Sequence, residues 1–327
     1  MAYLTTEKDT DIIIPKELAD EVYAGIIEGS TVLNHFDRLP DMGSATKELP
    51  VLDALGEAYF VGDTVTDDLT YGEDAEATHT PREGTAGLKR THYMKWKGVK
   101  IVAETLAIIL PVPREVLEDS KFNIWEAMQP RVIEAMGKRI DEAIIWGKNR
   151  PESWASGIVP TAINRGNFVV AGSGTDFAEE TSDLMGLIEQ YGFEATAFMA
   201  GPGIKKTIRN AKNVNGDLLF APGTGGAPDT FWGTDVIYTK NGSFDTSVAD
   251  LIVGDIGQGK FAIRQGFDVT ITDVGVINNE YGEIEINLFQ ENAKAMRVEM
   301  RLGWALPNPI HQLNADRTGY PFAVLTK

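Results

Sequence analysis

The side chains that most often carry out catalysis or bind metals are sparse in this sequence. Its histidines lie far apart, and none has the H-E-x-x-H spacing of a zinc site. The absence of cysteine excludes disulfides, thiolate metal ligands and cysteine nucleophiles. The G-x-S-x-G turn that presents a serine nucleophile is also missing. We therefore predict no catalytic residue, no metal site and no cofactor. The histidines are His35, His79, His92 and His311.

Two further patterns invite a chemical interpretation. Gly201-Pro202-Gly203 lies between a predicted strand and helix, a geometry that can bind phosphate. It matches neither the P-loop pattern nor G-x-G-x-x-G, since position 206 is lysine. Asp67-Asp68 and Glu73-Asp74 are acidic pairs in a polar stretch. We interpret the first pattern as a structural turn and the second as solvated side chains. An acidic hydrolase or a nucleotide-binding enzyme is the remote alternative.

The composition is that of an acidic protein with enough apolar residues for a sizeable core. The chain has 327 residues, 43% of them hydrophobic, and a formal net charge of -18. This charge argues against sequence-independent nucleic-acid binding, which needs lysine and arginine to neutralise phosphates. The polar N-terminus does not resemble a signal peptide, and no apolar run approaches the roughly 18 residues of a membrane span. We expect a soluble protein made in the cytoplasm, with no membrane partner.

The elements that would position functional side chains are organised around residues 105–148. An apolar run over residues 106–110 predicts a strand that Pro111 and Pro113 stop with a tight reversal. A short helix follows over residues 114–118, with Pro113 in its first turn. The second half of this stretch, from residue 123, has the longest helical pattern in the chain.

This long helix is predicted to begin at an Asn123 cap and to end at Gly147. It has one apolar stripe, and Asp141 falls among the residues assigned to its polar side. Because Pro130 removes a backbone hydrogen bond, we expect a bend there or a helix start near it. A helix that is apolar on one side forms a spine against which a sheet packs.

Residues 47–104 form an unusually long connection. Strand-like segments at 47–52, 58–61 and 93–102 flank a polar middle that is rich in glycine and threonine. Acidic residues dominate between Asp53 and Glu83, whereas basic residues occur without acids between Gly84 and Lys100. Opposite charges on adjacent limbs favour an antiparallel hairpin, and they could equally pair with a neighbouring copy. A solvated flexible loop is the alternative. The candidate inter-subunit contacts are Asp63, Asp67, Asp68, Glu73, Asp74, Lys89, Arg90, Lys95 and Lys97.

The rest of the chain mixes helices and strands, which indicates an α+β fold. An amphipathic helix is predicted from Pro15 to Gly29; it either docks on its own subunit or reaches a neighbour. The predicted helices of the second half are 181–191 and 204–212, and its predicted strands are 195–200, 235–239, 251–253, 261–264, 269–272, 284–287, 297–304 and 322–325.

Three segments in order resemble the major capsid proteins of tailed bacteriophages, the Hong Kong ninety-seven-like family. The first is IILPVPREVLEDS, followed by a helix ending in IDEAIIWG and by SGIVP. The second is ATAFMAGPGIKKTIRNAKNVNGDLLF with FWGTDVIYTKN. The third is LIVGDIGQGKFAIRQG with AMRVEMRLGWALPNP. Their order and spacing match across roughly residues 10–327.

The resemblance implies a role for each region. Residues 1–30 would be an N-terminal arm, 51–104 an extended loop over an adjacent subunit, and 155–257 an axial domain to which 305–327 return. The peripheral domain would comprise residues 31–50, 105–154 with the spine helix, and 258–304. Since Met1 lies close to the arm, scaffolding is expected from a separate protein or not at all.

The resulting hypothesis is a non-enzymatic capsid protein that forms hexamers and pentamers of an icosahedral shell around double-stranded DNA. Its implied partners are itself, a scaffolding protein, a portal and a decoration protein, and its implied location is the virion. An encapsulin-type nanocompartment shell with the same fold is the closest alternative.

Overall fold

The computed structural model describes most of the chain. The described residues are 25–26, 29–56, 64–66, 79–81, 93–120, 124–174, 176–212, 216–218, 220–221 and 229–327. Of the predicted N-terminal helix, only Gly25, Ile26 and Gly29 fall within these ranges, and all three are helical.

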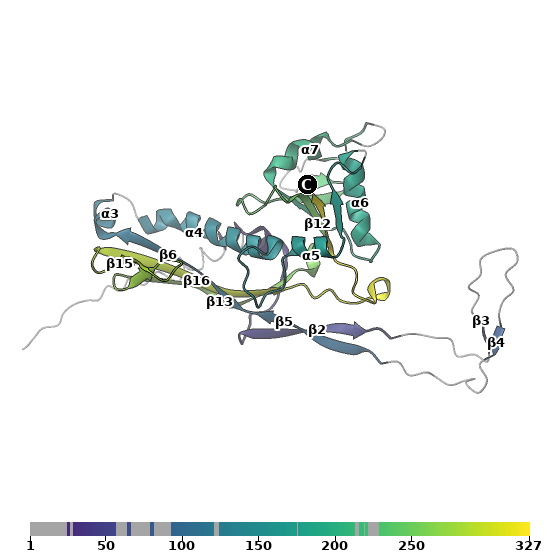
Figure 1. The fold of residues 1–327 in the computed structure, drawn as a ribbon, viewed down its shortest axis with the longest axis horizontal. Coiled ribbons are helices and arrows are strands. Elements are labelled where there is room, and N and C mark those ends of the chain that lie inside the picture. The colour runs from purple at the N-terminus through teal and green to yellow at the C-terminus, as the bar shows by residue number, and fades with distance from the viewer. Residues whose placement is uncertain are drawn as a thin grey trace, which may run out of the picture.

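One half of the folded body is a four-stranded sheet with a long helix along it (Figure 1). The strand order is β1-β13-β16-β6. β16 pairs antiparallel with both β13 and β6, and β1 adds a short parallel edge. The strands are β1 (Asp37–Arg38), β6 (Glu104–Pro113), β13 (Lys260–Thr272) and β16 (Ala293–Ala305). The predicted strands 261–264 and 269–272 are therefore one strand, which is irregular where its register shifts between Ile263 and Asp268.

The prediction that Pro111 and Pro113 stop the strand was wrong. β6 continues through both, paired with Ala295 and Ala293 of β16. β6 is an edge strand, so the missing N–H groups can face its unpaired side. Pro113 then caps α3 (Arg114–Asp119) instead of lying in its first turn.

The long helix is confirmed, although its end differs from a simple α-helix. α4 spans Ile124–Asp141 with Pro130 inside it, and a π-helical segment continues over Glu142–Trp146 to Gly147. Gly147 has φ 69°, the left-handed conformation that glycine adopts most readily, and it ends the helix as predicted. The Asn123 cap lies outside the described residues. A short helix, α2 (Thr31–His35), packs beside α4.

The second half of the body is a seven-stranded sheet of order β7-β17-β12-β8-β11-β10-β9. Its strands are β7 (Phe168–Val170), β8 (Ala197–Ala200), β9 (Phe220–Ala221), β10 (Asp229–Phe231), β11 (Thr234–Tyr238), β12 (Ala249–Gly254) and β17 (Phe322–Thr326). Its helices are α5 (Ile158–Asn164), α6 (Phe177–Glu189) and α7 (Lys205–Asn210). Short 3-10 turns occupy Pro202–Ile204, Ile256–Gln258 and Gln312–Asn314. The predicted helix at 181–191 begins earlier because Asp176 caps it by accepting from the Glu179 N–H.

Two hairpins extend from this body. β2 (Thr46–Ala54) and β5 (Lys95–Val102) pair antiparallel, as predicted, and project away from both sheets (Figure 1). β3 (Thr64–Thr66) and β4 (His79–Pro81) pair further along the same excursion. β14 (Val276–Asn278) and β15 (Ile284–Asn287) form the second hairpin, between β13 and β16.

One continuous core joins the two sheets. It combines Ile140 of α4 and Ile144 of the π-helical segment with Met300 of β16 and Ile252 of the seven-stranded sheet. A second cluster, which includes Leu184 and Phe198, lies under α6 and α7 on the other face of that sheet. Burial of this apolar surface is the main force that holds the two halves as one body.

Candidate assembly surfaces and the junction between the sheets

Only two of the predicted inter-subunit contact residues lie within the described residues. Lys95 and Lys97 lie on β5, exposed on the projecting hairpin. Neither side-chain ammonium group makes a hydrogen bond or ion pair with another described residue. The other candidates, Asp63, Asp67, Asp68, Glu73, Asp74, Lys89 and Arg90, lie outside the described residues.

The hairpin also carries apolar side chains that the charge pattern did not single out. Tyr93, Met94 and Trp96 are 77%, 61% and 67% exposed. Large apolar side chains that gather on a projecting element mark an interaction surface more often than an isolated exposed residue does. The run of large apolar residues among lysines from 93 to 97 was a signal that could have shown this.

The root of the hairpin is fixed by close packing. Ile101 is fully buried, and the Trp154 indole donates to the carbonyl of Val102 at 3.0 Å. β16 passes beneath β5 at Gly303, where a Cβ atom would lie 2.5 Å from the Val102 oxygen. Arg317 adds two further bonds, which give the hairpin a defined direction: its guanidinium donates to Asp53 at 2.8 Å and to the Leu52 carbonyl at 2.7 Å.

A buried carboxylate joins three segments of the chain. Asp141, predicted to lie on the polar side of the long helix, is instead fully buried at its C-terminal end. It accepts hydrogen bonds from the Ser30 hydroxyl at 2.6 Å and from the backbone N–H groups of Thr31 and Val32 at 2.9 and 3.1 Å. The polar-side assignment failed because α4 meets the Ser30–Val32 segment on that side. Gly137, one turn earlier, was a usable signal, since it allows Gly29 to approach α4 closely.

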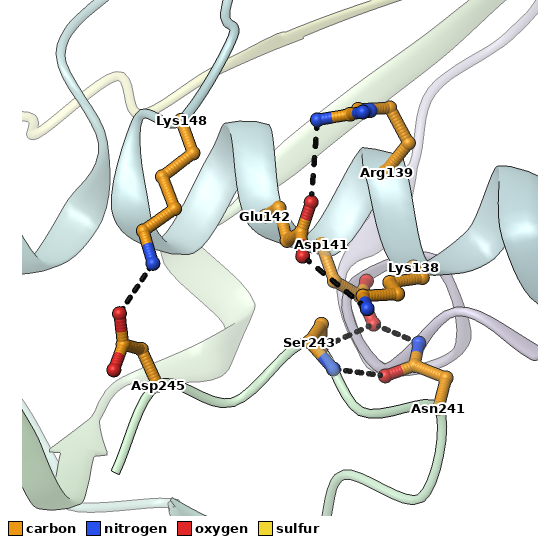
Figure 2. Close-up of polar contacts among 8 residues, drawn as sticks. All are labelled: Lys138, Arg139, Asp141, Glu142, Lys148, Asn241, Ser243 and Asp245. Carbon is orange, nitrogen blue, oxygen red and sulfur yellow. Dashed lines mark hydrogen bonds and ion pairs between the residues drawn. The ribbon is translucent and has the colours of Figure 1, made fainter. Parts of the chain in front are cut away.

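The same carboxylate reaches the loop after β11 (Figure 2). The Asn241 amide donates to Asp141 at 2.7 Å and to the Gly29 carbonyl at 3.0 Å, and the Ser243 hydroxyl donates to Asp141 at 3.5 Å. Burial raises the pKa of Asp141, and the hydrogen bonds that it accepts act against that rise. The junction thus fixes the start of the four-stranded half against the seven-stranded sheet.

A second polar contact crosses the same boundary. Lys148, directly after the long helix, donates to the carboxylate of Asp245 in the loop after β11 (Figure 2). This hydrogen bond, with others from Ser247, lowers the pKa of Asp245 to about 2. Glu142 pairs with Arg139 and Lys138 on the helix itself, at 3.4 and 3.8 Å.

The described residues offer little support for an enzyme site. No group of three or more aspartate, glutamate or histidine side chains among them could hold a metal ion. Gly201 leads into the 3-10 turn at Pro202–Ile204, as expected of a structural turn. A cavity of about 660 Å³ lies between α2, α4 and β11, but His35 on its wall contacts the Thr31 carbonyl of its own helix, at 2.8 Å. None of the described helices has the length and hydrophobicity that a membrane span requires.

Comparison with known proteins identifies the family. The sequence model of the phage capsid family matches residues 10–310. The chain belongs to that family. A curated relative in this family, the major capsid protein of Staphylococcus phage 80alpha, is 26% identical over 212 residues. This match covers 63% of the present chain and 62% of that relative's length.

Solved structures agree with the family assignment. A chain from Microbacterium phage Oxtober96 has a TM-score of 0.74 and 27% identity, with 91% of each chain covered. A chain from Mycobacterium phage Cain has a TM-score of 0.72 and 26% identity, covering 91% of this chain and 90% of that one. The α+β, Hong Kong ninety-seven-like fold predicted from the sequence is confirmed. A capsid chain of an empty GTA particle shares the fold at 16% identity, with a TM-score of 0.57.

Proposed function

We propose that this chain is the major capsid protein of a tailed bacteriophage. Copies of it would assemble as hexamers and pentamers into an icosahedral shell that encloses double-stranded DNA. The observation that carries the proposal is the family match over residues 10–310. The proposed role is structural and not enzymatic. It places the protein in the virion, after assembly in the host cytoplasm.

The architecture supports an assignment of each part of the chain to a domain of the capsid subunit. The four-stranded sheet, with α4 and residues 31–50, would be the peripheral domain, and residues 155–257 with 305–327 the axial domain. The pairing of β17 with β12 supports the return of the C-terminal segment. The projecting hairpin at 51–104 would lie over an adjacent subunit, and residues 1–30 would form an arm. The net charge of -18 suits a shell protein that should bind the enclosed DNA only weakly.

Electron microscopy of the protein expressed alone, beside size-exclusion chromatography, tests the proposal. Shells, tubes or capsomer rings are the expected result. Co-expression with a scaffolding protein, a portal and a decoration protein, the further partners proposed, should convert irregular assemblies into closed heads. A uniform monomer of about the chain mass of 35.7 kDa, even after co-expression, would overturn the proposal. Packaged protein in place of DNA in purified particles would favour an encapsulin-type compartment.

A further inference from the structure

An Asn-Gly dipeptide lies at the junction formed around Asp141. Asn241-Gly242 is one of two such dipeptides in the sequence, and Asn215-Gly216 is the other. Asparagine followed by glycine is the pair most prone to deamidation, because glycine has no side chain to shield its backbone nitrogen from the neighbouring amide. The junction between the two sheets therefore contains a residue that can be modified without any enzyme.

Deamidation joins two atoms of this dipeptide. The Gly242 nitrogen loses its proton and attacks Cγ of Asn241, so that a succinimide ring forms. The Cγ–Nδ2 bond breaks, and Nδ2 leaves as ammonia after taking up a proton. Water then opens the ring at either carbonyl carbon, which gives aspartate or isoaspartate at position 241. The reaction therefore needs access of the nitrogen to Cγ, and freedom of Nδ2 to leave.

The attacking group is free in the folded chain. Gly242 is exposed, and its φ of 72° lies in the left-handed region. A Cβ atom built on it would meet nothing within 4 Å, and its N–H forms no hydrogen bond with any described residue. No part of the described chain thus engages the nucleophilic nitrogen.

The leaving group, by contrast, is held firmly (Figure 2). Asn241 Nδ2 donates to Asp141 at 2.7 Å and to the Gly29 carbonyl at 3.0 Å. Its Oδ1 accepts from the Ser243 N–H at 3.1 Å. Departure of Nδ2 must break the first two bonds, and the tetrahedral geometry that Cγ adopts during the attack displaces Oδ1 from the third. The closed junction therefore protects Asn241 from deamidation.

The product does not fit the closed junction. A carboxylate at position 241 has no hydrogen to donate, and it would face the buried carboxylate of Asp141 where the amide now bonds. Two carboxyl groups can share such a site only if one of them binds a proton, which costs stability near neutral pH. Isoaspartate also lengthens the main chain before Ser243 by one CH2 group. Neither product can restore the present contacts.

We propose that Asn241-Gly242 is a deamidation site controlled by the junction, protected while the junction is closed and modified in subunits in which it opens. Modification prevents reclosure, so a transient separation of the two halves becomes permanent. The attachment of the Ser30–Val32 segment to Asp141 is weakened at the same time. The reaction takes place within one subunit, so its test does not depend on the proposed shell function.

Peptide mapping by mass spectrometry tests the protection. The full-length, unassembled subunit is incubated in mildly alkaline buffer, either folded or in urea, and the peptides containing Asn241 and Asn215 are followed. In urea both should deamidate at similar rates, with isoaspartate among the products, because both are unfolded Asn-Gly pairs. In the folded subunit Asn241 should react at least about tenfold more slowly than in urea, since the reaction waits for local opening. Equal Asn241 rates with and without urea would overturn the proposal.

Two variants distinguish local opening from global unfolding, once circular dichroism has verified that each is folded. Ser30→Ala removes the 2.6 Å hydrogen bond to Asp141 and should speed deamidation of Asn241 in the folded subunit at least about threefold. Ile188→Val lies in the separate core cluster under α6, so it lowers overall stability without touching the junction and should leave the rate unchanged. Equal acceleration by both variants, or none by Ser30→Ala, would contradict control by the junction.

The consequence of modification is tested with Asn241→Asp, which reproduces one of the two products. Amide hydrogen exchange at Thr31 and Val32, whose N–H groups bond to Asp141, should become at least about tenfold faster than in the parent. Asn210→Asp makes the same chemical change at an exposed position of α7 and should leave this exchange unaltered. Parent-like exchange in Asn241→Asp would show that the junction tolerates the product, and the proposal would then be wrong.

Discussion

Asp141 holds its place by hydrogen bonds alone, since no described lysine or arginine forms an ion pair with it. Four donors lie within 3.1 Å of its two oxygens: the Ser30 hydroxyl, the Thr31 and Val32 N–H groups, and the Asn241 amide. A carboxylate, which only accepts hydrogen bonds, is the appropriate partner for these four hydrogen-bond donors. The ability of residue 141 to accept hydrogen bonds therefore matters more for stability than the volume of its side chain.

Asp141→Asn tests this requirement with almost no change in shape. The new NH2 group must face at least one of the donors, so a buried donor loses its partner. We expect the free energy of unfolding to fall by about 2–4 kcal/mol, which urea titration of the unassembled subunit would measure. Ser243→Ala, which loses only the 3.5 Å contact, should cost less than about 1 kcal/mol. Equal effects of the two substitutions would contradict the assigned role.

The Lys148–Asp245 contact predicts a pH dependence of stability. The pKa of Asp245 is lowered in the folded chain from 3.8 to about 2, so the folded carboxylate stays ionised and bound to Lys148 down to about pH 2. That stabilisation is present above the unfolded pKa and is lost as the pH falls through the folded one. The urea midpoint of Lys148→Met should lie below that of the parent at pH 5, and the gap should close towards pH 2. Lys206→Met is the control, and a gap of constant size across this range would refute the assignment.

At the scale of elements, β16 connects three other strands. It pairs with β13 and β6 and passes beneath β5 at Gly303, where any side chain would meet the Val102 carbonyl. Gly303→Ala should therefore push the hairpin root away from the sheet and lower the free energy of unfolding by about 1–3 kcal/mol. Gly266→Ala on neighbouring β13 has open space around it and should change stability little. Differential scanning calorimetry of both variants would distinguish a steric clash from a general intolerance of alanine in this sheet.

Much of the element pattern could be predicted from local sequence, and the exceptions share a cause. The strand at 284–287 and the long helix to Gly147 follow from periodicity and turn residues alone. The strand through Pro111 could not be found locally, because an edge position permits proline and sheet order is a property of the whole chain. Asp141 was misplaced for the same reason: its donors lie a hundred or more residues away. Periodicity shows which face is apolar, but not which polar residue has distant partners.

The direction of the projecting hairpin is a property of the whole molecule, and Arg317 near the C-terminus fixes it. Besides its bonds to Asp53 and Leu52, its own carbonyl accepts from Arg165 at 2.8 Å, and its φ of 54° sets a tight local turn. The hairpin is thus connected through Arg317 to α5 and the seven-stranded half. An assembly surface held in a defined direction loses less conformational entropy on binding than a freely moving one.

Arg317→Ala should release the hairpin without unfolding the body. We expect faster amide hydrogen exchange in residues 46–54 and 95–100, with unchanged protection of the seven-stranded sheet, and a lower yield of assembled particles. Arg317→Lys keeps the charge but cannot reach both acceptors in one plane, so it should show most of the same effect. Arg131→Ala, which removes an exposed ion pair on α4, is the matched control. If exchange rose throughout both sheets, Arg317 would be a general stabilising residue; if it rose nowhere, the hairpin would be held by its packed root alone.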